Sequence, residues 1–84
     1  MNKPKAKFPS EDHLIEFIAW SLNIPVSRIN PHTDLVDDLY LDQIDRDLLI
    51  AALENRFGIY LSSEEVDRID TVRDASQSLQ RHAA

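Results

Sequence analysis

The stretch DLVDDLYLDQID, residues 34–45, decides the fold of this chain because it leads a loop directly into an amphipathic helix. Asp42 is placed to act as the N-cap of that helix, since its carboxylate can accept a hydrogen bond from the first turn. The apolar residues that follow recur every four positions and share one helix face: Leu49, Leu53 and Phe57. Gly58 comes next, and glycine suits a left-handed C-cap. These signals predict a helix that begins near Asp42 and ends at Phe57-Gly58.

Upstream of this helix, Ser10 is placed as the N-cap of a first helix that should run to about Leu22 or Asn23. Its core stripe follows the spacing i, i+3, i+4, i+8 and comprises Leu14, Phe17, Ile18 and Leu22. Residues 24–33 contain two prolines, which break helices, so a long irregular loop is predicted there. We expect this loop to be pinned to the core by Ile24, Val26 and Ile29.

Downstream, two more helix starts are marked by capping patterns. Ser62-Ser63-Glu64-Glu65 is a capping box that should open a short third helix through Val66 and Ile69. Thr71-Val72-Arg73-Asp74 is a variant of the same box and predicts a last helix, whose buried residues should be Val72, Ala75 and Leu79. The sequence therefore predicts an all-α domain of four helices, with a long loop between the first two and a short third helix.

The chain length and composition are those of one small globular domain. Apolar residues form 43% of its 84 residues and charged residues 29%. We expect a flexible basic arm over residues 1–9, a helical domain over residues 10–80 and a frayed tail over residues 81–84. The absence of Cys excludes a disulfide framework and a thiol nucleophile. No apolar stretch is long enough to cross a bilayer, so we expect a cytoplasmic protein that does not bind a membrane.

The net charge of −6 is unevenly distributed along the chain. Between Asp34 and Asp70, eleven acids stand against three arginines, which is a local charge of −8. Such an acidic surface repels phosphate backbones and makes nucleic acid an unsuitable partner. It favours encounter with proteins that carry basic surfaces.

Four segments resemble the acyl carrier protein family in their order and spacing. They are residues 34–39, Asp42-Gln43-Ile44-Asp45, residues 53–59 and residues 69–74, and the overall likeness covers about Leu14 to Leu79. The resemblance implies the four-helix bundle of that family and a non-enzymatic role in fatty acid, lipid or secondary metabolism. In the family, the position held here by Gln43 is a serine that carries the phosphopantetheine arm.

The departures from the family pattern gather around this position. A carboxamide cannot form the phosphodiester that attaches the arm, so Gln43 predicts a chain without phosphopantetheine. Tyr40 and Leu41 replace the small residues, a glycine first, that usually precede the motif. Further along the helix, Arg46 adds a positive charge to a face that the family keeps acidic. Asp47 stands where an apolar residue near the acyl pocket is common, and Leu48 where a partner-binding acid is common.

These observations predict a carrier-like protein that acts by docking to other proteins, with enzymes of fatty-acid or polyketide type as candidate partners. The surface expected to bind them is formed by Leu41, Asp42, Ile44, Asp45 and Leu48. An alternative is a working carrier that is loaded at an unusual residue or without the usual arm.

A second apolar surface is suggested by the first helix, where Ile15 and Trp20 lie outside the core stripe. Two interpretations stay open for these residues. Trp20 could pack against the loop or the N-terminal arm, or Ile15 and Trp20 could form an exposed patch for a partner or for self-association.

Other chemistry has little support in the sequence. The three histidines, His13, His32 and His82, lie in different segments. Residues 34–45 fail the EF-hand pattern, because Leu39 stands where the loop needs glycine. The acids Asp37, Asp38, Asp42 and Asp45 leave only weak divalent-cation binding as a hypothesis. Because no nucleophile–base pair or phosphate-binding loop is present, we expect neither an enzyme nor a metal site.

Overall fold

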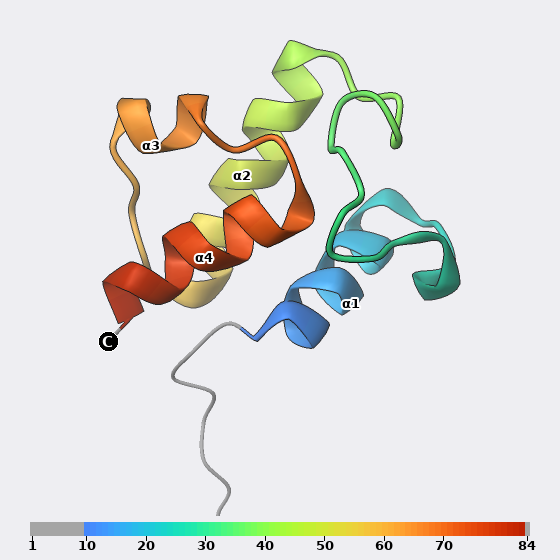
Figure 1. The fold of residues 1–84 in the computed structure, drawn as a ribbon, viewed down its shortest axis with the longest axis horizontal. Coiled ribbons are helices and arrows are strands. Elements are labelled where there is room, and N and C mark those ends of the chain that lie inside the picture. The colour runs from blue at the N-terminus through green and yellow to red at the C-terminus, as the bar shows by residue number, and fades with distance from the viewer. Residues whose placement is uncertain (1–9, 84) are drawn as a thin grey trace, which may run out of the picture.

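The computed structural model describes residues 10–83 and contains helices joined by loops, as the sequence predicts (Figure 1). The expected arm over residues 1–9 lies outside the described residues. The elements are α1 (Glu11–Leu22), a single 3₁₀ turn η1 (Val26–Arg28), α2 (Gln43–Phe57), α3 (Ser63–Asp67) and α4 (Val72–Ala83). The four-helix plan, the long connection between α1 and α2 and the short α3 are all confirmed. None of the helices within residues 10–83 has the length and apolar character that crossing a bilayer requires.

The helix ends form through the capping residues that the sequence predicts. The Asp42 carboxylate accepts a hydrogen bond from the Asp45 backbone N–H at 2.8 Å, which fixes the first turn of α2. At the other end of α2, Gly58 adopts φ +68°, a left-handed conformation that costs glycine little. Ser62 and Glu65 complete a reciprocal capping box at the start of α3. Thr71 and Asp74 exchange hydrogen bonds of the same kind at the start of α4.

The core lies where α1 packs against α2 and α4. Its most buried side chains come from α1, α2, α4 and the connections, and they include Leu14, Ile18, Leu35, Leu53, Ile69, Val72 and Leu79, all at most 1% exposed. The predicted core faces of α1, α2 and α4 are thereby confirmed. Because α3 ends at Asp67, Ile69 enters the core from the connection that follows rather than from the helix.

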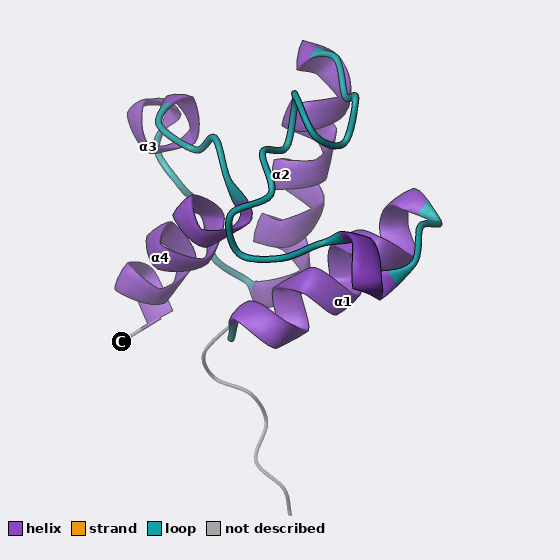
Figure 2. Cartoon of the chain, turned by 45° about the vertical axis from the view of Figure 1, so that its right-hand side comes forward, coloured by secondary structure: helices purple, strands orange, loops and turns teal. Residues whose placement is uncertain are grey.

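The long loop between α1 and α2 is held in a way that the sequence did not indicate (Figure 2). Ile29 is buried and Ile24 is partly buried, as predicted, but Val26 is half exposed because it lies in the η1 turn. The loop is also tied to the α3–α4 connection by backbone hydrogen bonds. Leu35 N–H donates to the Asp70 carbonyl at 2.8 Å, and Val72 N–H donates to the Thr33 carbonyl at 3.0 Å.

The last helix continues beyond the boundary expected at residue 80. Arg81 and His82 belong to α4, which runs to Ala83. Two side-chain contacts hold this end in place: Arg81 donates to the Ser78 hydroxyl at 3.2 Å, and His82 Nε2 lies 2.7 Å from Glu65 Oε2. The structure thus places residues 81–83 in α4, beyond the expected boundary, and fraying of this end stays a prediction.

Candidate functional site

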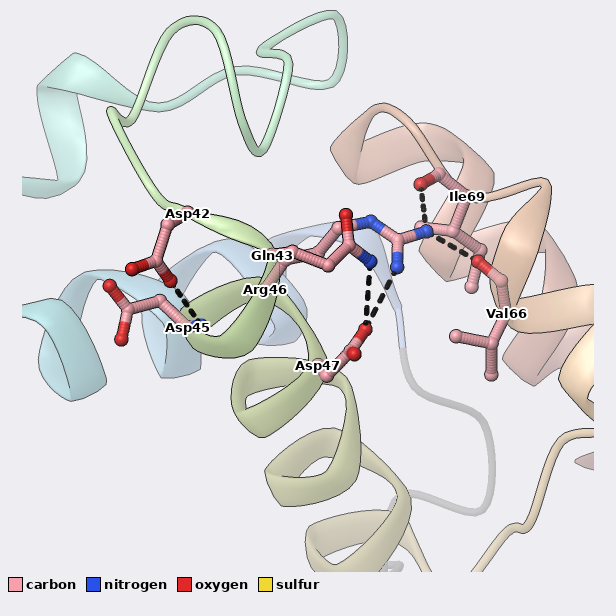
Figure 3. Close-up of polar contacts among 7 residues, drawn as sticks. All are labelled: Asp42, Gln43, Asp45, Arg46, Asp47, Val66 and Ile69. Atoms are coloured by element: carbon pink, nitrogen blue, oxygen red, sulfur yellow. Dashed lines mark hydrogen bonds and ion pairs between the residues drawn. The ribbon is translucent and has the colours of Figure 1, made fainter.

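Gln43 is the first residue of α2, and its side chain is exposed. The Nε2 group of Gln43 donates a hydrogen bond to Asp47 Oδ1 at 3.3 Å, one helical turn further on (Figure 3). This contact directs the carboxamide along the helix, on the side that faces the α3–α4 connection. The position carries no hydroxyl, so the attachment chemistry of a phosphopantetheine arm does not fit the residue present.

Arg46 is the residue of this site whose role the sequence did not show. Its side chain is almost fully buried, at 7% exposure. The guanidinium donates to the backbone carbonyls of Val66 and Ile69, the latter at 2.7 Å, and to Asp47 Oδ1 at 3.1 Å (Figure 3). The expectation that Arg46 places a positive charge on the exposed face is wrong. Its guanidinium is buried and joins α2 to the α3–α4 connection through hydrogen bonds.

A hollow of about 410 Å³ lies beside Gln43, between α2, the long loop and the α3–α4 connection. We call it the acidic hollow, and its lining residues are Asp34, Val36, Asp37, Gln43, Arg46, Asp67 and Asp70. Four of them are carboxylates, whereas the single cation is already bound to protein acceptors. The local charge is therefore negative and disfavours a phosphate group at this place.

The residues predicted to bind partners lie on another side of α2. Leu41, Asp45 and Leu48 line a groove of about 430 Å³ between α1 and α2, together with Ser21, Leu22, Leu49 and Ala52. Ile44 and Leu48 are 69% and 63% exposed, although both are large apolar residues. The structure thus brings Leu41, Asp45 and Leu48 together and separates them from Gln43 and Arg46, which line the acidic hollow. The altered residues do not share one face of the helix.

Comparison with known proteins agrees with this architecture. The family model described as "Phosphopantetheine attachment site" matches residues 12–79. A curated "Acyl carrier protein" from Solidesulfovibrio magneticus (strain ATCC 700980 / DSM 13731 / RS-1) is 35% identical over 66 residues, which cover 79% of this chain and 85% of that relative. The chain belongs to the acyl carrier protein family. Membership supports a carrier role rather than an enzymatic one.

Tyr40 marks a local strain in this acyl carrier protein fold, just before α2. Its backbone adopts φ +57°, in the left-handed region that disfavours side chains with a Cβ atom. The family resemblance places a glycine here, so the backbone conformation is the one that glycine adopts readily. The Tyr40 side chain is 85% exposed, so burial of the ring does not compensate for the strain.

The two residues of the second predicted patch lie in different environments. Trp20 is 78% exposed, but Ile15 is only 8% exposed and belongs to the core. Ile15 directly follows Leu14 on α1, and the buried face of this helix is wide enough to include both side chains because α1 packs against both α2 and α4. Trp20 lies instead against Phe17, with ring centroids 6.2 Å apart.

The structure offers no support for a metal site in the part of the chain that it describes. Residues 10–83 contain no group of three or more His, Cys, Asp or Glu side chains arranged to hold a metal ion. Asp37, Asp38, Asp42 and Asp45 are thus not brought together as such a group. Two of these carboxylates instead accept backbone hydrogen bonds, Asp38 from Asp34 N–H and Asp42 from Asp45 N–H, both at 2.8 Å.

Proposed function

We propose that this member of the acyl carrier protein family acts by docking to other proteins and carries no phosphopantetheine arm. The observation that supports this most directly is the side chain of Gln43, which occupies the first position of α2 and is hydrogen-bonded to Asp47. A serine there would present a hydroxyl to the modifying enzyme. The carboxamide offers no oxygen that can form the phosphodiester.

The docking surface in this proposal is the predicted set, Leu41, Asp42, Ile44, Asp45 and Leu48. It combines an exposed apolar centre, Ile44 and Leu48, with exposed carboxylates on Asp42 and Asp45. Within residues 10–83, neither Asp42 nor Asp45 takes part in an ion pair, and the guanidinium of Arg46 is buried and bound elsewhere. Partners with an apolar pocket edged by Lys and Arg fit this surface, and enzymes of fatty-acid or polyketide type are the candidate class.

Intact mass after co-expression with a phosphopantetheinyl transferase tests the absence of the arm. We expect the wild-type mass to equal that of the unmodified chain, and the Gln43→Ala variant provides a matched control without a hydroxyl. A mass increment of one arm on the wild type would overturn the proposal and favour the alternative, a carrier loaded at an unusual residue.

The Gln43→Ser variant then tests the docking surface itself. If the surface around the start of α2 still recognises the transferase, this variant gains the arm, and its loading rate reports how well the two proteins dock. Adding Ile44→Ala or Leu48→Ala should lower this rate about tenfold, the effect of losing an apolar contact worth about 1.4 kcal/mol. Trp20→Ala, a comparable exposed residue on α1, should leave the rate unchanged. Equal rates in all these variants would contradict docking through Ile44 and Leu48.

A further inference from the structure

A second exposed surface lies at the opposite end of α2 from Gln43. Here α1 and the last turn of α2 form a groove of about 410 Å³, which we call the aromatic groove. Its lining residues are His13, Glu16, Phe17 and Trp20 from α1, with Arg56 and Phe57 from α2. Gln43 and Arg56 are thirteen positions apart on α2, so the two ends are separated by about 20 Å at a rise of about 1.5 Å per residue.

The two walls of the aromatic groove carry opposite charges that do not meet. Glu16 lies on the α1 wall and Arg56 on the α2 wall. Among the ion pairs of residues 10–83 there is none between these two side chains, although both are exposed at the same groove. The Arg56 guanidinium instead lies over the Phe57 ring, 5.8 Å from its centroid. Each wall thus presents a charge of one sign beside an aromatic surface.

We propose that the aromatic groove binds the same groove of a second copy of this chain. In a contact with twofold symmetry, residue i of one copy meets residue j of the other and the reverse contact follows automatically. The α1 wall of each copy would then face the α2 wall of its partner. This arrangement forms two Glu16–Arg56 ion pairs, related by symmetry, and places both Trp20 rings between the aromatic walls.

The composition of the groove suits this occupant better than a partner of one charge sign. A strongly basic partner would meet Arg56, and a strongly acidic one would meet Glu16, so each would leave one wall opposed by a like charge. A second copy satisfies both walls at once. Tryptophan and arginine are also the residue types that contribute most to binding at the centre of interfaces. The net charge of −6 on each copy opposes association at long range, so we expect a weak, reversible dimer.

Sedimentation equilibrium at protein concentrations up to about 1 mM, the dissociation range of weak contacts, tests the dimer. We expect the wild type to show a monomer–dimer equilibrium, and Trp20→Ala to weaken it by about tenfold or more, as is typical for loss of a central aromatic residue. Tyr40→Ala removes an equally exposed aromatic ring at the other end of α2 and should leave the equilibrium unchanged. A wild type that stays monomeric over this range would overturn the proposal and leave the groove to a different protein.

A charge exchange tests the pairing of the two walls. Glu16→Arg and Arg56→Glu should each weaken the dimer, because each places like charges across the interface. The double variant Glu16→Arg, Arg56→Glu restores opposite charges with the signs exchanged, so its dissociation constant should return toward the wild-type value. Both side chains are exposed, and circular dichroism should show folded helices in all three variants. A double variant as weak as the single ones would overturn the twofold pairing.

Discussion

The start of α2 and the starts of α3 and α4 use the same capping hydrogen bond, but the residues next to the cap differ in conformation and exposure. In all three, a side-chain oxygen accepts a hydrogen bond from the backbone three residues later: Asp42 from Asp45, Ser62 from Glu65 and Thr71 from Asp74. At α3 and α4 the acid also accepts a hydrogen bond from the backbone of the cap residue, which completes the box. The carboxylates of Glu65 and Asp74 thus stabilise the first turns of α3 and α4.

At α2, by contrast, several local preferences are broken within a few residues. Tyr40 adopts a left-handed conformation, Ile44 is exposed, and the ionised side chain of Arg46 is buried. A sequence that only had to fold would follow the local preferences, and real proteins break them where function requires it. This difference is what the proposed docking role of the start of α2 predicts, while the complete capping boxes at α3 and α4 serve to hold those helices.

The largest effect that tests this contrast is expected at Arg46, which lies in the recognition region but has a structural role. Arg46→Ala leaves the carbonyls of Val66 and Ile69 without their buried donor. We therefore expect the free energy of unfolding to fall by about 3 kcal/mol. Urea denaturation followed by circular dichroism measures this loss. Arg56→Ala, an exposed arginine on the same helix, should change stability by less than about 0.5 kcal/mol. If the free energy of unfolding fell by a similar amount in both variants, the buried hydrogen bonds of Arg46 would contribute little to stability.

Arg46 also shows where prediction from sequence ends. Helix caps and core stripes depend on residues within one or two turns, so the sequence predicted the helix starts and the buried faces of α1, α2 and α4. The acceptors of Arg46 are carbonyls 20 and 23 residues away, and no local pattern connects them. The hydrogen bond from Leu35 to Asp70 and the burial of Ile15 likewise depend on how distant segments pack.

For the candidate site, too, the sequence predicted local positions but not how distant segments surround them. The sequence placed Gln43 at the start of α2, as observed, and it grouped Leu41, Asp45 and Leu48, which the structure brings together in one groove. It did not show that Gln43 and the docking residues face different hollows, since this follows from where the long loop and the α3–α4 connection lie. The left-handed conformation of Tyr40 had a signal in the sequence, namely a large residue where the family places glycine.

A smaller effect, of opposite sign, is expected at Tyr40. Because glycine adopts φ +57° without steric cost, Tyr40→Gly should raise the free energy of unfolding by up to about 1 kcal/mol. The matched control is Tyr60→Gly, which removes a similarly exposed ring from a residue whose φ is negative. That variant should lose about 0.5 kcal/mol, since glycine makes the unfolded chain more flexible. If the free energy of unfolding fell in both variants, Tyr40 would not be strained. The argument that the start of α2 is adapted to docking would then be weaker.

The smallest effect concerns Glu65 in the structural region and depends on pH. The hydrogen bond from Ser62 N–H and the contact with His82 lower the pKa of Glu65 from its ordinary value of 4.5 to about 2. Because the folded state holds the proton less tightly than the unfolded state, this stabilisation is complete above about pH 4.5 and is lost as the pH falls toward 2. Urea midpoints of the wild type and of Glu65→Gln, measured across this range, should therefore converge as the pH falls. A constant difference between them would show that ionised Glu65 does not hold α3 against α4, and that the two regions differ less than their geometry indicates.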